Sequence, residues 1–153
     1  MSALDNRIPP PIVVVLVGAI MWLAAFFTPY QVWPSAWRLV VAAGIFAAGL
    51  IIGGSGIVAF GRAKTTIDPI NLQAASVLVT GGIFRFSRNP MYVGFAGLLT
   101  AWAIYLAVPW TLIGVAAFVL YIWRFQILPE ERVMSAKFGA AYSNYQSRVR
   151  RWL

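Results

Sequence analysis

Long apolar stretches without charged residues alternate with short polar segments along this chain. Residues 8–37, 39–61 and 89–123 contain no Asp, Glu, Lys or Arg. A helix needs about 20 predominantly apolar residues to cross a bilayer. The first two stretches therefore predict one membrane-spanning helix each, over residues 11–28 and 38–60.

The third apolar stretch is too long for a single span at a rise of about 1.5 Å per residue. Pro109 lies inside it, and proline disfavours a helical conformation in the residue before it, here Val108. This pattern predicts a helical hairpin with arms over residues 90–107 and 110–128. The expected fold class is therefore all-α, a polytopic membrane protein with about four transmembrane helices.

A less apolar segment, residues 130–149, follows the fourth predicted span. Pro129 is suited to the first position of a new helix, where its missing N–H costs nothing. Apolar residues recur at helical spacing, which predicts a cytoplasmic amphipathic helix that lies on the headgroups or covers the end of the bundle. These apolar positions are Val133, Phe138, Ala141, Tyr142, Tyr145 and Val149. Gly139 interrupts the pattern and weakens the helix.

Composition supports a membrane protein, since 61% of the residues are apolar and only 10% are charged. Soluble domains have about 25% charged residues. The sequence contains no Cys and no His. This excludes disulfides, thiol nucleophiles, Cys/His zinc sites and His-based catalytic triads, so we expect no metal site. Any catalysis must use other polar side chains or the backbone.

The charged residues predict the orientation in the membrane. Twelve basic and four acidic residues give a net charge of +8. Basic residues accumulate in cytoplasmic loops, and here they gather between the second and third spans and after the fourth. They are Arg62, Lys64, Arg85 and Arg88, then Arg132, Lys137, Arg148, Arg150 and Arg151. We therefore expect a multi-pass protein of the cell (inner) membrane, with both termini in the cytoplasm and the first span retained rather than cleaved. The basic residues form no single run, so we expect no nucleic acid partner.

Aromatic residues mark the opposite membrane face, because Trp and Tyr prefer the headgroup level. They lie between the first two spans and around the hairpin turn: Tyr30, Trp33, Trp37, Trp102, Tyr105 and Trp110. The four carboxylates are Asp5, Asp68, Glu130 and Glu131, and none lies in the middle of a span. This argues against a proton-coupled transporter, which usually needs an ionisable residue inside the membrane.

Three groups of residues each allow a structural and a functional interpretation. Glu130-Glu131 either stabilises the start of a helix through its dipole or binds ribose hydroxyls or a cation. Arg85 and Arg88, beside Gly81-Gly82, either anchor the chain to anionic lipid or bind a carboxylate or phosphate. The glycines Gly53, Gly54 and Gly56 either permit close helix packing or bring the backbone close to a cofactor.

Two separated motifs resemble a known family. Residues 81–94 have the sequence GGIFRFSRNPMYVG, and residues 129–132 have the sequence PEER, followed by Phe138-Gly139 and by Tyr142 and Tyr145. Both resemble signatures of the isoprenylcysteine carboxyl methyltransferase and phospholipid methyltransferase superfamily of integral membrane methyltransferases. The resemblance covers residues 60–153. The first two helices are less specific, with Gly54-Ser55-Gly56 a loose match to a Gly-x-Gly element.

The resemblance implies a methyltransferase that uses S-adenosylmethionine (SAM) at the cytoplasmic membrane face and acts on a lipophilic or lipid acceptor. The cofactor-binding residues it implies are Arg85, Arg88, Asn89, Pro90, Tyr92, Gly94, Glu130 and Glu131. Among them Arg88, Asn89 and Tyr92 are the expected catalytic residues. Many carboxyl methyltransferases have His where this chain has Asn89, so a mechanism that uses an imidazole does not transfer. We expect one domain over residues 1–153, with two spans in 11–60 and the motifs in 61–153.

Other functions remain open from the sequence. A reductase that binds a nicotinamide cofactor has a similar carboxyl-terminal hairpin, although such enzymes are usually longer. A small transporter or a lipid-binding bundle without catalysis fits the length. The acceptor atom, the general base and the oligomeric state are also open, because small-residue faces serve packing within and between chains.

Overall fold

A computed structural model describes residues 7–28, 35–63 and 77–153, and these residues form helices and connecting segments without a strand. The elements in chain order are α1 (Pro10–Phe26), α2 (Ala36–Arg62), the short 3-10 helix η2 (Gly82–Arg85), α3 (Pro90–Leu106), α4 (Thr111–Ile122), the π-helical segment η3 (Trp123–Ile127) and α5 (Leu128–Gln146). The positions Asp5, Tyr30, Trp33, Lys64 and Asp68 lie outside the described residues. The all-α expectation is confirmed for the described part of the chain.

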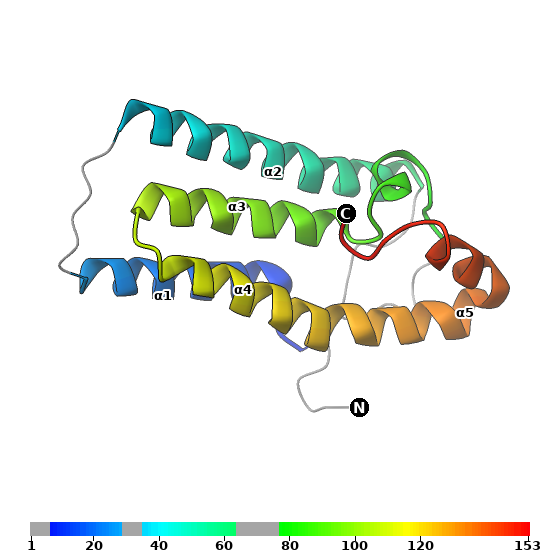
Figure 1. Ribbon diagram of the computed structural model, residues 1–153. Coiled ribbons are helices and arrows are strands. Elements are labelled where there is room, and N and C mark those ends of the chain that lie inside the picture. The colour runs from blue at the N-terminus through cyan, green and yellow to red at the C-terminus, as the bar shows by residue number, and fades with distance from the viewer. Residues whose placement is uncertain (1–6, 29–34, 64–76) are drawn as a thin grey trace.

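The long helices run alternately in opposite directions (Figure 1). Helix α3 is central, since it packs against α1, α2 and α4. The start of α1, the end of α2, the start of α3 and the end of α4 all lie at one end of this bundle. The chain after α5 returns to the same end, next to the start of α3 (Figure 1). Segments that are far apart in the sequence therefore meet there.

Glycine residues bring α2 and α3 into close contact. A Cβ atom on Gly94 of α3 would lie 2.7 Å from the Gly49 carbonyl oxygen and 2.9 Å from the Gly53 Cα of α2. A Cβ atom on Gly56 would lie 2.9 Å from the Met91 side chain, whereas nothing lies within 4 Å of one on Gly54. Backbones this close leave no room for larger residues. The structure thus supports the packing interpretation for Gly53 and Gly56.

Helix α1 is held between α3 and α4. The Trp102 indole Nε1 of α3 donates a hydrogen bond to the Gly18 carbonyl oxygen of α1 at 3.1 Å. Met21 of α1 is buried where Gly114 of α4 leaves space for it. Phe118 of α4 is fully buried in the same cluster. The small residues on α1 and α4 thus serve packing, as those on α2 and α3 do.

The outer surface of the bundle is apolar. Large residues such as Val15 of α1, Val40 of α2 and Ile113 of α4 are about 70% exposed, a pattern that suits lipid rather than water. Two helices are long and apolar enough to cross a membrane: Ala36–Arg62, and the continuous helix Thr111–Gln146. Helices α1 and α3 are apolar but shorter.

The helix that begins at Thr111 is too long to lie wholly in a bilayer. From Thr111 to the kink at Gly139, its roughly 28 residues extend about 42 Å, whereas the hydrocarbon core is about 30 Å thick. Its apolar part ends at Leu128, directly before Pro129-Glu130-Glu131-Arg132. The carboxylates therefore lie beyond the apolar part that can span a membrane.

The hairpin turn agrees with the expectation from Pro109. Helix α3 ends at Leu106, Ala107 takes a left-handed conformation with φ 57°, and α4 begins at Thr111. The Thr111 hydroxyl donates to the Val108 carbonyl oxygen at 2.6 Å. Proline has no N–H for a continuing helix, so the chain reverses here.

The expectation that Pro129 starts a separate helix is wrong. The backbone of Ile127 and Leu128 is helical, and α4, η3 and α5 form one continuous helix. A proline ring inside an α-helix clashes with the carbonyl four residues earlier, here that of Phe125 in η3. The wider π-helical turn accommodates this clash. The glutamate pair is thus carried on a direct extension of α4.

Helix α5 folds back at Gly139, where φ is 49° and ψ is −125°. After this kink, Tyr142 and Tyr145 are buried against Phe84 of η2, next to the end of α2. Of the two expectations for residues 130–149, these contacts support the one in which the segment covers the end of the bundle.

Replacing Gly94 by alanine tests the α2–α3 contact. The added methyl group would meet backbone atoms that cannot move independently, so we expect Gly94→Ala to destabilise the protein by about 1–3 kcal/mol. Gly44→Ala is the matched control, because nothing lies within 4 Å of its added Cβ. Thermal unfolding in detergent measures both variants. Equal melting temperatures for the two would contradict the close packing of these helices.

Candidate active site

A cavity of about 300 Å³ lies at the end of the bundle where the chain segments meet. Its wall is formed by the start of α1, the end of α2, residues 77–92 and α5. Most of the lining is apolar and aromatic, with contributions from Pro10, Ile57, Phe60, Leu78, Phe84, Phe95 and Met134. The lining also carries the polar groups of Arg88, Asn89, Tyr92, Glu130, Glu131, Tyr142 and Tyr145. A mainly apolar lining with a few polar groups is typical of small-molecule sites, which occupy about 300–1,000 Å³.

Two hydrogen bonds join α3 and its preceding residues to α5 across the cavity. The Tyr92 hydroxyl donates to Glu130 Oε1 at 2.5 Å. The Arg88 guanidinium Nη2 donates to Glu131 Oε1 at 2.9 Å. The two motifs, separated by about forty residues in the chain, thus form one site.

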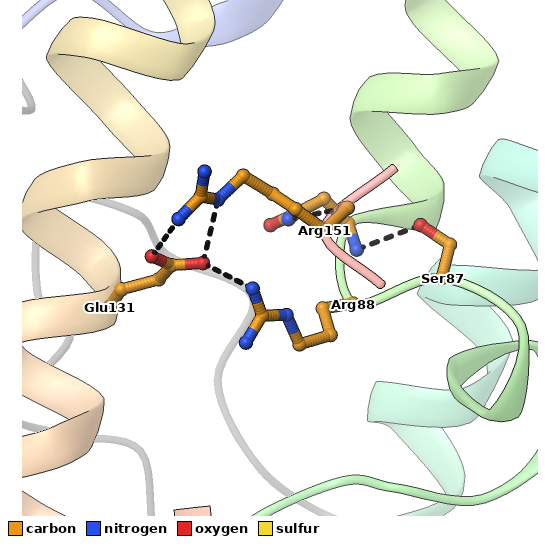
Figure 2. Close-up of polar contacts among 5 residues, drawn as sticks. Ser87, Arg88, Glu131 and Arg151 are labelled. Carbon is orange, nitrogen blue, oxygen red and sulfur yellow. Dashed lines mark hydrogen bonds and ion pairs between the residues drawn. The ribbon is translucent and has the colours of Figure 1, made fainter. Parts of the chain in front are cut away.

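A second arginine binds the same carboxylate, as Figure 2 shows. Arg151 donates from Nε to Glu131 Oε1 at 3.0 Å and from Nη2 to Glu131 Oε2 at 2.8 Å. This two-bond pairing is the strong geometry between guanidinium and carboxylate groups. The hydrogen bond to Glu131 raises the pKa of Arg151 above its usual value. Glu131 is therefore shared by two arginines from different parts of the chain.

The backbone around Arg151 is tied to the residues before α3. The Arg88 amide N–H donates to the Arg150 carbonyl oxygen at 3.0 Å. The Asn89 side-chain Nδ2 donates to the Arg151 carbonyl oxygen at 2.8 Å, and the Asn89 amide donates to the Ser87 hydroxyl at 3.1 Å. Ser87 is 1% exposed, so it is part of the support beneath the site.

The start of α3 explains why the Asn89 side chain can hold another segment. Asn89 precedes the helix, and its side chain forms no capping hydrogen bond. Pro90 occupies the first turn, where its missing N–H leaves no donor unsatisfied. The side-chain amide of Asn89 thus binds the Arg151 backbone instead of capping the helix.

Aromatic residues of the cavity lining also contact one another. The Tyr145 hydroxyl donates to the Phe84 carbonyl oxygen at 2.7 Å. The rings of Phe60 and Phe84 meet edge to face, with centroids 5.3 Å apart. Such contacts fix the ring positions. The apolar side of the cavity is therefore a rigid surface built from α2, η2 and α5.

The chemical state of Glu130 depends on its surroundings. Burial raises its pKa from 4.5 to about 7, although the hydrogen bond from Tyr92 acts in the opposite direction and the charge of Glu131 raises it further. A carboxyl group with such a pKa can exchange a proton near neutral pH. Glu130 accepts its hydrogen bond from the Tyr92 hydroxyl, whereas Glu131 is paired with two guanidinium groups.

The structure brings most of the sequence-predicted site residues together. Arg88, Asn89, Pro90, Tyr92, Glu130 and Glu131 line the cavity. Gly94 lies instead in the α2–α3 contact, and Arg85 is exposed on η2; neither lines the cavity. The sequence did not identify Arg151 as a site residue. It lies among other basic residues, and the positive-inside rule already explains such a group as cytoplasmic.

Comparisons with known proteins match the same part of the chain. A family model described as phospholipid methyltransferase matches residues 37–141. An uncharacterized protein of Haemophilus influenzae is 41% identical over 63 residues, which are 41% of this chain and 100% of that protein. Protein-S-isoprenylcysteine O-methyltransferase A of Arabidopsis thaliana is 34% identical over 104 residues, 66% of this chain and 51% of the plant protein. The protein-S-isoprenylcysteine O-methyltransferase of Schizosaccharomyces pombe is 29% identical over 111 residues, 71% of this chain and 46% of the yeast protein. The matched part of this chain corresponds to about half the length of these two named relatives.

Glu130 gives the stability of the protein a defined pH dependence. The folded protein retains the Glu130 proton up to about pH 7, whereas the unfolded chain releases it near 4.5. Because the folded state binds more protons in this window, its stability falls as the pH rises from 5 to 8. Glutamine does not titrate, so we expect the stability of Glu130→Gln to fall less between pH 5 and 8 than that of the unmodified protein. Melting temperatures of both proteins across this range test it, and parallel curves would contradict the raised pKa.

Proposed function

The chain belongs to the phospholipid methyltransferase family, and from this premise we propose that it transfers a methyl group from SAM to a lipophilic acceptor at a membrane surface. The observation that carries the proposal is the cavity in which Arg88 and Tyr92 meet Glu131 and Glu130. This site combines both cations and carboxylates with an apolar wall. Such a combination suits a ligand with charged and aromatic parts.

The residues present fit SAM in three respects. Arg88 carries a buried guanidinium Nε with no hydrogen-bond partner, which suits the carboxylate of the methionine part. Glu130 lies beside it and suits the amino group or the ribose hydroxyls. The aromatic wall around Phe60 and Phe84 suits the adenine ring.

SAM, when bound, supplies an electrophilic methyl group: the acceptor's lone pair forms the new bond to carbon while the carbon–sulfur electrons pass to sulfur. The residues of this chain bind and align the reactants and exclude water. Arg88 holds an anionic group, and Tyr92 keeps Glu130 in place through its hydroxyl. If the acceptor loses a proton, as an amine does, Glu130 is positioned to receive it near neutral pH.

The acceptor proposed here is lipophilic. Apolar residues of α1, α2 and α3 line one side of the cavity, including Pro11, Ile57 and Phe95. The outer faces of the same helices are apolar and exposed. An isoprenoid or fatty carboxylate and a lipid amine both have this character, and the two named relatives are isoprenylcysteine O-methyltransferases.

The proposed topology has four spans formed by α1, α2, α3 and the apolar stretch from Thr111 to Leu128. Helices α1 and α3 have 17 residues each, which is near the lower limit for spanning a bilayer. The positive-inside rule places the cavity at the cytoplasmic face of the cell (inner) membrane, since the basic residues gather at that end. Trp37, Tyr105 and Trp110 are exposed, and we assign them to the opposite interface.

Calorimetric binding of SAM and of its demethylated product to the purified protein tests the proposal. We expect saturable binding to the unmodified protein and a loss of at least tenfold in affinity in Glu131→Gln, which leaves the largely buried Arg88 and the partly exposed Arg151 without their shared carboxylate. Thermal unfolding confirms that the variant is folded. Transfer of a labelled methyl group to lipid fractions then identifies the acceptor. Binding of NADPH in place of SAM would instead favour the reductase alternative.

A further inference from the structure

Arg151 pairs with Glu131 through two hydrogen bonds from one edge of its guanidinium group. Its Nε and Nη2 bind the two carboxylate oxygens separately, at 3.0 and 2.8 Å. Arg88 therefore reaches only one of these oxygens, Oε1, and does so through Nη2 alone. Arg151 donates two of the three hydrogen bonds that this carboxylate accepts from the two arginines, although Arg151 lies outside the residues that line the cavity.

This division leaves Arg88 with an unused donor. The Arg88 side chain is 10% exposed, and its Nε is buried without a hydrogen-bond partner among the residues that the structure describes. A buried donor without a partner costs about 1–3 kcal/mol, or more for a charged group. Arg88 lines the cavity, so a small shift of its side chain would bring this buried donor to a bound anion.

The charges around the two arginines also favour an anion. Glu131 carries one negative charge, whereas Arg88 and Arg151 together carry two positive charges. Glu130, the other carboxylate that lines the cavity, accepts its hydrogen bond from Tyr92 rather than from either arginine. One positive charge is therefore left over at the Arg88–Glu131–Arg151 cluster.

Without Arg151, Glu131 would have a free oxygen next to Arg88. Guanidinium and carboxylate groups prefer two parallel hydrogen bonds. Arg88 would then turn its Nε and Nη2 together onto Glu131, and the donor would be withdrawn from the cavity.

We propose that Arg151 is a positioning residue that occupies Glu131 and thereby keeps the Arg88 Nε available for a ligand carboxylate. The inference rests on the proposed function, in which this ligand group is the carboxylate of the methionine part of SAM. Arg151 acts through Arg88 and touches no ligand itself. Asn89 supports this role, because it holds the Arg151 backbone beside the cluster.

The experiment compares two ligands, of which only one carries the amino-acid part with its carboxylate and amino group. S-adenosylhomocysteine has it, whereas 5′-deoxy-5′-methylthioadenosine keeps the adenosine and the sulfur but lacks the amino-acid part. We expect Arg151→Gln to weaken binding of S-adenosylhomocysteine about 10- to 100-fold, the range for a hydrogen bond to a charged group. Binding of methylthioadenosine, measured in the same titration series, should stay unchanged.

Four further variants sharpen the result. Arg148→Gln removes the same charge from an exposed residue whose side chain donates to the Asn144 carbonyl oxygen of its own helix end, so we expect unchanged binding of both ligands. Arg151→Lys keeps the charge but loses the two-bond pairing, so an intermediate loss is expected. Arg88→Gln with Arg151→Gln should be no weaker than Arg88→Gln alone, because both act on one hydrogen bond.

The outcomes separate this inference from the proposed function. An equal loss for both ligands in Arg151→Gln would assign Arg151 a general structural role and overturn the inference. Unchanged affinity for S-adenosylhomocysteine would overturn it as well. If the unmodified protein binds neither SAM nor S-adenosylhomocysteine, the proposed function fails and the inference fails with it.

Discussion

The carboxylate of Glu131 is the point on which the functional end of the molecule depends. It accepts hydrogen bonds from Arg88, which precedes α3, and from Arg151, which follows α5. These three groups come from segments that are far apart in the sequence. A partly buried carboxylate of this kind is strongly disfavoured without cationic partners. The pairing therefore fixes the start of α3, the start of α5 and the segment after it relative to one another.

The close packing of α2 against α3 at glycine residues holds the helix ends that carry this cluster. Gly94 and Gly49 allow the backbones of α2 and α3 to touch, so the start of α3 cannot shift relative to the end of α2. Arg88 and Tyr92 flank that start, while Phe60 is near the end of α2. The polar and aromatic walls of the cavity are thus positioned by the same helix contact. Small residues inside the bundle in this way determine the shape of a site that they do not line.

The helix that continues from α4 into α5 sets the distance between the apolar stretch of α4 and the glutamate pair. The π-helical turn of η3 accommodates Pro129 without interrupting the helix. Its Gln126 is fully buried and donates to the Ile8 carbonyl oxygen at 2.8 Å, which ties the turn to the chain before α1. Glu130 and Glu131 follow within one turn of helix. They are therefore held just beyond the apolar stretch, where the proposed lipophilic acceptor and the proposed methyl donor would meet.

The sequence by itself determined the helices, the hairpin turn at Pro109 and the two motifs. These features depend on local properties: apolar runs long enough to span a bilayer, and proline's missing N–H. Six of the eight expected site residues line the cavity for the same reason, since the motifs sit at helix ends that must return to one membrane face. Only the tertiary structure decided that Gly94 serves helix packing, that Pro129 continues a helix and that Arg151 shares Glu131 with Arg88. Each of these depends on which atoms meet across separate segments. Apolar patterning cannot specify such contacts, because it fixes the length of a helix and not the partner of a particular side chain.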